Sequence, residues 1–257
     1  MAVSSGPSGT IVETLESLAR RYPAPLIQGQ LDGIPRNAFH VELVKMLVGK
    51  KDAVIADIGG GICLFSPACA AAGMQVTLVD DFRDQVNQSN PGSSALSLHR
   101  ELGVTVVAQD VTLGLSLPRN QFDAITCFDA MEHWHHSPRA LFHGLIDSLR
   151  PGGWFIVSVP NCVNLRKRIS VPFGFGKWSP ISAWYDAEVF RGHVREPDVQ
   201  DLWYIARDLG LKEITVFGRN WLGFNRPGLR QLMPLIDVVL RMRPSLCANL
   251  YLVGRKP

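Results

Sequence analysis

The sequence predicts an α/β fold in which a mostly parallel sheet is covered by helices on both faces. Between residues 53 and 160, short apolar runs typical of strands alternate with segments of helical periodicity, which is the pattern of βαβ units. Three of these runs end in or beside a carboxylate, and parallel strands bring such ends to one edge of a sheet. With 257 residues, of which 46% are hydrophobic and 19% charged, the chain suits one domain with additions.

Two helices are expected before the first strand. Residues 10–22 have apolar side chains at helical spacing, and Thr10 with Glu13 forms the pattern of a capping box. A connection rich in proline and glycine leads to residues 38–48, which again have an apolar side. The expected division of the chain is a helical cap, 1–50, and a main domain, 51–257.

Five strands are expected next, with helices between them. Pro151-Gly152-Gly153 predicts a sharp turn into the fifth strand. Asn90-Pro91-Gly92 interrupts the helical pattern after the second strand, so we expect an irregular connection at residues 87–95. The expected strands are 54–58, 76–80, 104–108, 123–128 and 154–159, and the clearest helices are 64–72 and 138–149.

The regular alternation of strands and helices ends after Pro160. Residues 161–192 are expected to form an insertion over the ligand site at the edge of the sheet where the strand-end carboxylates meet. A helix follows, with Pro197 in its first turn and Gly210 just after its end. The insertion carries the basic run Arg166-Lys167-Arg168 and the aromatic residues Phe173, Phe175, Trp178 and Trp184. The elements expected after it are a helix at 197–209, strands at 213–218 and 248–254, and a helix at 229–241 between these strands.

The first strand ends in an acid, Asp57, and runs into Gly59, Gly60 and Gly61 before a helix begins. Glycine lets the backbone approach a ligand closely at such a turn. In a nicotinamide-binding site the turn reads G-x-G-x-x-G, but here Leu64 occupies the third glycine position. By Coulomb's law, the Asp57 carboxylate would repel a pyrophosphate and attract a ligand that carries an ammonium and a sulfonium.

Two further strand ends carry carboxylates. Asp80 ends the second strand roughly 20 residues past the glycine turn, where an acid commonly accepts ribose hydroxyls. Asp81 could compete for that role, or it could be a solvated acid at a helix start. Asp110 follows the third strand, where it can accept from an adenine amino group while Val111 offers its backbone amide. Carboxylates at three successive strand ends predict a nucleoside without a phosphate.

Residues 53–160 resemble the class I S-adenosylmethionine-dependent methyltransferases, and residues 193–257 are similar to the tail of their small-molecule branch. The resemblance implies a Rossmann-like three-layer sandwich with a seven-stranded, mostly parallel sheet, an antiparallel last strand and an insertion after strand five. It also implies S-adenosyl-L-methionine as cofactor. Cys63 departs from the family, which usually has glycine there; we expect it to be a small packing residue. The residues implied to hold the cofactor are Asp57, Gly59, Gly60 and Gly61 at its methionine end, Asp80 or Asp81 at the ribose, Asp110 and Val111 at the adenine, and Phe128 and Asp129 at the fourth strand end.

Three histidines are candidate bases. His133 and His136 follow the fourth strand, and His193 lies just beyond the insertion. Histidine titrates in the useful pH range. A base matters if the acceptor is a hydroxyl, whose proton must leave, and matters much less for a thiolate or a free amine. The alternative is that His133 caps or packs the following helix.

We expect the acceptor to be a hydroxyl of a small metabolite or of a lipid- or glycan-linked precursor. The basic run Arg166-Lys167-Arg168, with the aromatic residues after it, could bind an acidic acceptor or make a peripheral contact with an anionic membrane. The alternative is an exposed basic turn with the aromatic residues folded beneath it. A net charge of +3 argues against a nucleic-acid partner, and the oligomeric state stays open.

Two other classes of function remain open. A nicotinamide-dependent oxidoreductase is disfavoured by Asp57 and Leu64, whereas a non-catalytic cofactor-binding partner subunit is compatible with every residue named above. The five cysteines have neither disulfide nor zinc spacing, so no metal is expected. No apolar stretch approaches the ~20 residues needed to span a bilayer, and we expect a cytoplasmic protein with reduced thiols.

Overall fold

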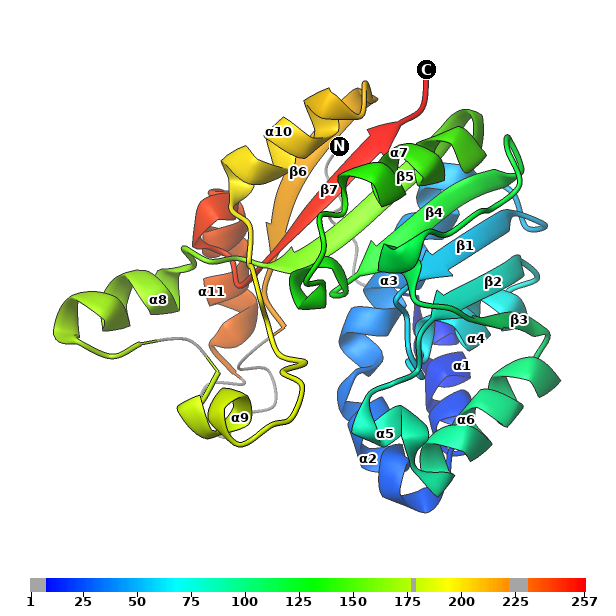
Figure 1. Cartoon of the computed structure of the whole chain (residues 1–257), viewed down its shortest axis with the longest axis horizontal. Coiled ribbons are helices and arrows are strands. Elements are labelled where there is room, and N and C mark those ends of the chain that lie inside the picture. The colour runs from blue at the N-terminus through cyan, green and yellow to red at the C-terminus, as the bar shows by residue number, and fades with distance from the viewer. Residues whose placement is uncertain (1–7, 177–178, 222–230) are drawn as a thin grey trace.

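A computed structural model describes residues 8–176, 179–221 and 231–257, and its centre is one seven-stranded sheet (Figure 1). The strands are β1 (Val54–Ile58), β2 (Gln75–Asp80), β3 (Val104–Ala108), β4 (Phe122–Phe128), β5 (Leu149–Pro160), β6 (Lys212–Arg219) and β7 (Asn249–Arg255). Their order across the sheet is β3-β2-β1-β4-β5-β7-β6, and β7 runs antiparallel to both of its neighbours. The Rossmann-like fold that the resemblance implies is thereby confirmed.

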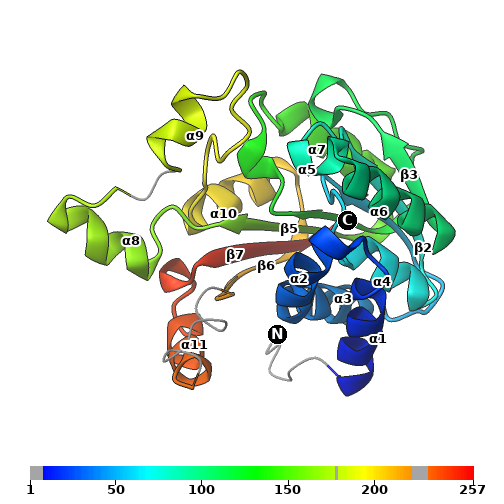
Figure 2. The same cartoon turned by 90° about the horizontal axis from the view of Figure 1, so that it is seen from below.

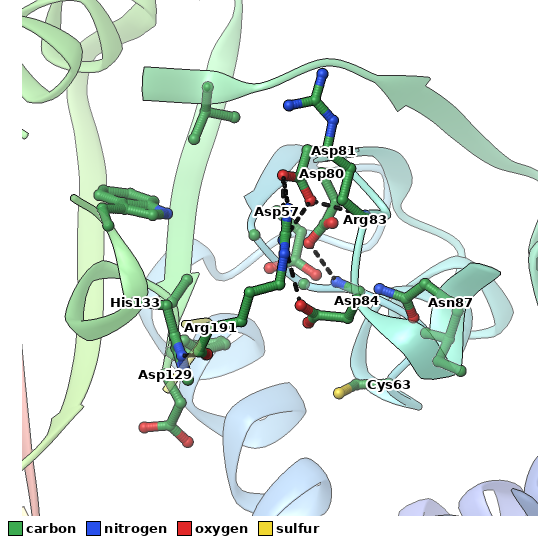
Figure 3. A pocket seen from close by; sticks show the side chains of 18 of the residues that line it. Asp57, Cys63, Asp80, Asp81, Arg83, Asp84, Asn87, Asp129, His133 and Arg191 are labelled. Carbon is green, nitrogen blue, oxygen red and sulfur yellow. Dashed lines mark hydrogen bonds and ion pairs between the residues drawn. The ribbon is translucent and has the colours of Figure 1, made fainter. Parts of the chain in front are cut away.

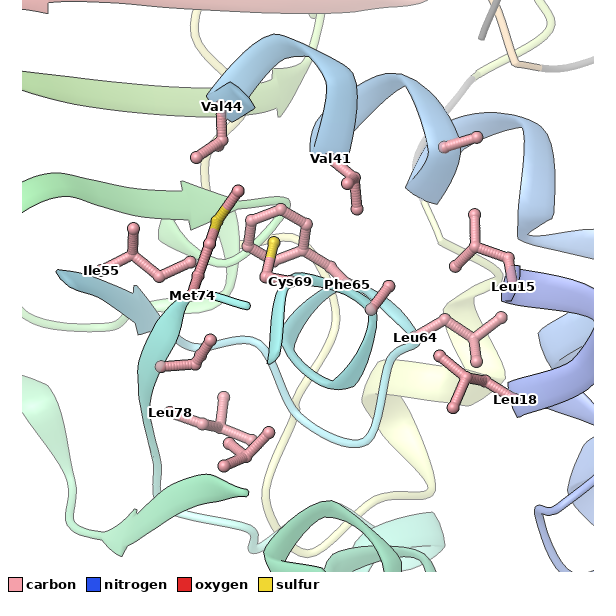
Figure 4. Close-up of a cluster of buried hydrophobic side chains, with 14 of the residues drawn as sticks. Leu15, Leu18, Val41, Val44, Ile55, Leu64, Phe65, Cys69, Met74 and Leu78 are labelled. Atoms are coloured by element: carbon pink, nitrogen blue, oxygen red, sulfur yellow. The ribbon is translucent and has the colours of Figure 1, made fainter. Parts of the chain in front are cut away.

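Helices cover both faces of the sheet (Figures 1 and 2). The α-helices of the described residues are α1 (Gly9–Ala19), α2 (Ala24–Asp32), α3 (Ile34–Val48), α4 (Phe65–Ala71), α5 (Gln85–Gln88), α6 (Asn90–Glu101), α7 (Arg139–Ser148), α8 (Leu165–Ser170), α9 (Ile181–Tyr185), α10 (Val199–Asp208) and α11 (Met233–Arg241). Buried side chains of α1, α3, α4 and α6 form one apolar cluster with the sheet (Figure 4), and those of α7 and α10 form another on the opposite face.

The alternation of side chains along β1 decides where its acid lies. Ile55 belongs to the cluster under α3 and α4, whereas Ala56 and Ile58 belong to the cluster under α7 and α10. Because side chains alternate with period two, Asp57 faces the same side as Ile55, toward α4. The strand pattern therefore places a carboxylate inside the apolar layer, at the point where the strand ends.

Two predicted helix starts are wrong. Helix α1 begins at Gly9 after Ser8, and no side chain of the described residues caps it, so the capping box expected from Thr10 is not formed. The backbone amide of Ser8 instead donates to Glu42. Helix α10 has Asp198 as its N-cap, since this carboxylate accepts from two backbone amides of the first turn, and Pro197 lies before the helix. Gly210 follows the end of α10 with φ +65°, as predicted.

The chain is more helical than predicted in two connections. The segment expected to link the first two helices contains α2. At the expected interruption, Ser89 caps α6 and Pro91 stands in its first turn, where no amide hydrogen is needed. Pro91 thus marks a helix start. The sharp turn expected at Pro151-Gly152-Gly153 lies instead within β5, as an irregularity in its pairing with β4. Of the helix expected at 229–241, the first two residues lie outside the described part of the chain.

In the described residues, no helix combines the length and apolar character needed to cross a membrane.

Candidate active site

A cavity of about 560 Å³ opens at the carboxyl ends of β1, β2 and β4 (Figure 3). Open α/β sheets place their ligand sites at this edge. Of the predicted site residues, His193 alone does not line it, and that residue lies beside His133. The predicted residues that line the cavity are Asp57, Gly59, Gly60, Gly61, Asp80, Asp81, Asp110, Val111, Phe128, Asp129, His133 and His136.

The turn after β1 has no room for a side chain at Gly59 or Gly60. A Cβ atom at Gly60 would overlap the carboxylate of Asp57, and one at Gly59 would come within 2.5 Å of the Ala130 Cβ. Gly59 and Gly61 also have φ values of +74° and +54°, which other residues rarely adopt. The turn therefore brings bare backbone to the cavity wall.

The carboxylate of Asp57 is 2% exposed and is held by two hydroxyls. Ser66 of α4 donates to one oxygen at 2.7 Å, and Thr126 of β4 donates to the other at 2.9 Å. Burial raises the pKa of Asp57 to about 6, and the charge of Asp80 adds to the rise, while the two hydroxyl hydrogen bonds lower it. The group is thus poised to ionise when a cation approaches.

The other two strand-end acids differ in their surroundings. Asp80 accepts from the backbone amides of Gly61 at 3.0 Å and Phe82 at 2.7 Å, and burial raises its pKa despite these bonds. Asp110 is more open. Burial opposes ionisation there, but hydrogen bonds from Thr112 and the charge of Arg83 hold the pKa of Asp110 below its usual range.

Asp81 has a partner that the sequence does not reveal. The guanidinium of Arg191 lies 3.3 Å from the Asp81 carboxylate and 3.2 Å from that of Asp84 (Figure 3). Asp84, not Asp81, is the N-cap of α5, so the interpretation of Asp81 as a helix-start acid is wrong. Arg191 belongs to an irregular segment, where no periodicity could have indicated this contact.

Helix α3 supplies one wall of the cavity, and none of its residues was predicted at the site from the sequence. Arg36 donates to Asp129 at 2.7 Å, and Asp129 in turn accepts from Ser158 at 3.0 Å. His40 stacks on Phe128 with ring centroids 3.9 Å apart. The two contacts made by α3 join residues more than 85 positions apart, so local patterns carry no signal for them.

His133 and His193 stand together at the side of the cavity, with ring centroids 4.9 Å apart. The Nδ1 atom of His133 donates to the carbonyl of Arg191 at 2.8 Å, and that of His193 donates to Glu196 at 2.7 Å. Next to them, Glu132 is 1% exposed, and its Oε2 atom has no hydrogen-bond partner among the described residues. Burial raises the pKa of Glu132 to about 9, and the charge of Asp129 adds to the rise.

The remaining candidates occupy less specific positions. His136 is exposed at the mouth of the cavity near Asp110. Cys63 also lines the cavity and is exposed, so its predicted role as a packing residue is wrong (Figure 3). Within the basic run, Lys167 is ion-paired with Glu196, and Arg168 donates to the carbonyl of Val163.

The insertion only partly covers the site. Helices α8 and α9 project from the body of the molecule (Figures 1 and 2). Among the described residues of 161–192, only Val189, Phe190 and Arg191 line the cavity. Phe173 and Phe175 are 75% and 66% exposed, so these aromatic residues are not folded beneath the basic run. Trp184 is exposed as well, and Trp178 lies outside the described residues.

Comparisons with known proteins agree with this fold. A family model described as a methyltransferase domain matches residues 35–216. A phosphoethanolamine N-methyltransferase 2 of Haemonchus contortus, in complex with S-adenosyl-L-methionine, superposes with a TM-score of 0.54 at 17% identity, covering 85% of this chain and 52% of that one. An S-adenosylmethionine-dependent methyltransferase of Thermotoga maritima gives 0.57 at 16% identity, covering 95% of this chain and 100% of that one.

Curated relatives match a shorter region. A ubiquinone biosynthesis O-methyltransferase of Hydrogenovibrio crunogenus is 26% identical over 125 residues, which covers 49% of this chain and 50% of that protein. A protein of the same name from Xanthomonas campestris is 30% identical with the same coverage. The chain spans about half the length of the curated relatives it matches.

Proposed function

Because this chain belongs to the methyltransferase domain family, we propose that it transfers a methyl group from S-adenosyl-L-methionine to a hydroxyl of a small metabolite or of a lipid- or glycan-linked precursor. The observation that carries the proposal is the cavity itself. Carboxylates from three strand ends and a glycine turn lie around it, with two paired histidines at one side. Family membership removes the nicotinamide-dependent alternative.

The charges around the cavity suit a cationic donor. Asp57, Gly59, Gly60 and Gly61 would receive its methionine end, since the buried acid attracts an ammonium and the bare turn admits a close approach. Asp80, beside Asp81, would accept the ribose hydroxyls. Asp110 and Val111 would hold the adenine, and Phe128 and Asp129 at the end of β4 would also line the donor.

We further propose that residues 1–50 are a cap over the donor. Arg36, Asn37 and His40 of α3 line the cavity. Two hydrogen bonds tie the cap to the turn after β1. Gln30 donates to the carbonyl of Ile62, and the hydroxyl of Tyr22 donates to the carbonyl of Cys63. A closed cavity would keep water away from the sulfonium during transfer.

The paired histidines support a hydroxyl as acceptor. In both rings Nδ1 donates its hydrogen, so in the neutral imidazole Nε2 keeps a lone pair that can take a proton. As the hydroxyl loses its proton, the oxygen forms a bond to the methyl carbon while the carbon–sulfur bond breaks, which leaves S-adenosylhomocysteine. His136 is a third candidate for this role. The names of the curated relatives also specify O-methylation.

A peripheral membrane contact would bring a lipid-linked acceptor to this site. Arg166 is exposed beside exposed apolar residues of the projecting helices, such as Ile169 and Phe173. A basic and apolar surface of this kind favours an anionic bilayer. Sedimentation with phosphatidylglycerol vesicles, compared with neutral vesicles, tests the contact: equal sedimentation with both, or with neither, would contradict it.

Turnover separates an enzyme from a non-catalytic partner subunit. The purified protein is incubated with methyl-tritiated S-adenosyl-L-methionine and paired acceptors that differ only in carrying a hydroxyl or an amine. Label in the hydroxyl compounds supports the proposal. Label confined to amines would overturn the choice of accepting atom, and binding of the donor without any transfer would favour the partner subunit.

A further inference from the structure

Three side chains beside the cofactor cavity bring ligand atoms to one place. Glu132 and His133 lie in the short 3-10 helix Met131–His133, and His193 comes from the segment after the insertion. Each offers one oxygen or nitrogen, and these atoms all lie within 4.8 Å of one another. Segments 60 residues apart thus meet at a point that a single cation could occupy.

Both histidines are oriented as metal ligands are. A ligating imidazole commonly donates its other ring hydrogen to a carbonyl or carboxylate, which fixes the tautomer and the ring plane. His133 donates from Nδ1 to the carbonyl of Arg191, and His193 donates from Nδ1 to Glu196. Glu196 is placed for this role, because its carboxylate accepts from His193 at 2.7 Å and is ion-paired with Lys167 on its other side.

The buried carboxylate of Glu132 supplies an independent observation. In the part of the chain that the structure describes, its Oε2 atom is buried from solvent and has no hydrogen-bond partner. A buried carboxyl oxygen without a partner is costly, and the group can be ionised there only if a counter-charge is supplied. The nearby cations are engaged elsewhere: Lys167 pairs with Glu196, and Arg36 pairs with Asp129.

We propose that Glu132, His133 and His193 bind one divalent transition-metal cation of the Zn²⁺ class. Two imidazoles favour such a metal over Mg²⁺, which prefers an all-oxygen shell. Two histidines and one glutamate also leave coordination positions open, as in catalytic zinc sites. Asp129 is not a member of the set, since its oxygens already accept from Arg36 and Ser158.

The role of the cation in the reaction rests on the proposed function. His133 lines the cavity, so an acceptor hydroxyl could take an open position on the cation (Figure 3). The bound oxygen would release its proton to solvent near neutral pH. Methyl transfer to that oxygen would then form the carbon–oxygen bond as the carbon–sulfur bond breaks. In this arrangement the histidines hold the metal and do not themselves take the proton.

Direct metal binding tests the proposal without turnover. Chelator-treated full-length protein is titrated with ZnCl₂ in a calorimeter and with CoCl₂ in a spectrophotometer, with MgCl₂ as a comparison. We expect one equivalent of Zn²⁺ with micromolar or tighter Kd and visible Co²⁺ bands of a four- or five-coordinate site. We expect Glu132→Gln and His193→Ala to lose both signals, and Glu196→Gln to weaken Zn²⁺ binding by about 10- to 100-fold.

Two matched variants act as controls, since both remove a potential ligand that lines the same cavity. His136→Ala and Cys63→Ser should bind Zn²⁺ as the unaltered protein does. The proposal is overturned if the unaltered protein binds no Zn²⁺, or if Glu132→Gln and His193→Ala bind it with unchanged affinity. Tighter binding of Mg²⁺ than of Zn²⁺ would overturn the assigned metal class.

Titration of the same samples with S-adenosyl-L-methionine separates this proposal from the proposed function. Methyl transfer at full rate with chelator present would leave the function standing and remove the metal's role. Zn²⁺ binding in a protein that binds no S-adenosyl-L-methionine would leave the metal site standing and remove the proposed function.

Discussion

Arg191 lies 3.3 Å from Asp81, although the two residues are 110 positions apart in the chain. The contact ties the end of the insertion to the end of β2, and Arg191 reaches Asp84 as well. Its neighbours Val189 and Phe190 line the same cavity. The pair therefore joins the segment proposed to face the acceptor to the strand end proposed to hold the donor.

Removal of this contact should affect the rate of ligand release from the cavity more than the stability of the fold. Arg191→Ala is expected to accelerate release of S-adenosylhomocysteine, measured by stopped-flow displacement. The free energy of unfolding should change by less than about 1 kcal/mol, because partly exposed ion pairs contribute little to stability. An unchanged release rate, or a loss of several kcal/mol in urea unfolding, would contradict this role of Arg191.

The turn after β1 should not tolerate a side chain at Gly60. In Gly60→Ala the new methyl group would overlap the Asp57 carboxylate, so we expect loss of donor binding and destabilisation by about 1–3 kcal/mol. Gly144 in α7 is the matched control, because a methyl group there meets open space. Gly144→Ala should keep donor affinity and gain up to about 1 kcal/mol in urea unfolding. Equal behaviour of the two variants would refute the steric argument.

Donor affinity should depend on the ionisation of Asp57. Its pKa of about 6 means that the carboxyl is protonated at pH 5 and charged at pH 7.5. A cationic donor prefers the charged form, so affinity should fall by up to about tenfold for each pH unit below 6. Calorimetry across this range should give a smaller dependence for Asp57→Asn. Identical pH profiles of the two proteins would remove Asp57 from donor binding.

The ionisation of Asp57 should lower the stability of the fold as pH rises, whereas it raises the affinity for the donor. Because the pKa of Asp57 is higher in the folded chain than its ordinary value of 3.8, the folded state binds more protons between about pH 4 and pH 6. The free energy of unfolding should therefore fall as pH rises through this window, relative to that of Asp57→Asn. Urea unfolding at several pH values measures the difference, and a difference that grows with pH would be inconsistent with the burial of Asp57.

The strands and the acids at their ends were predictable because each depends on a short local pattern. Val54–Ile58 coincides with the first expected strand, and buried alternation together with a following glycine turn suffices to locate it. The antiparallel last strand came from family resemblance, since no local pattern gives strand direction. The positions of Asp80 and Asp110 at the cavity follow from topology once the strands are known.

Contacts between residues far apart in the chain could not be predicted from local sequence patterns. Arg36, Arg191 and Glu132 become informative only when α3 and the end of the insertion fold back on the strand ends. Errors at helix starts have a local cause: Thr10 and Pro197 fit a starting pattern, but Ser8 and Asp198 precede the helices. Several polar residues in succession leave the first residue of a helix ambiguous.

Calorimetric titration of the unaltered protein and Asp80→Asn with S-adenosyl-L-methionine and S-adenosylhomocysteine tests the central claim most directly. Asp80 lines the donor cavity and holds the glycine turn through Gly61, while asparagine keeps its shape and removes the charge that would accept the ribose hydroxyls. We predict micromolar binding of both nucleosides, weakened at least about tenfold in the variant, which corresponds to about 1.4 kcal/mol. Absence of binding to the unaltered protein, or equal affinities for the two proteins, would contradict the proposed donor site.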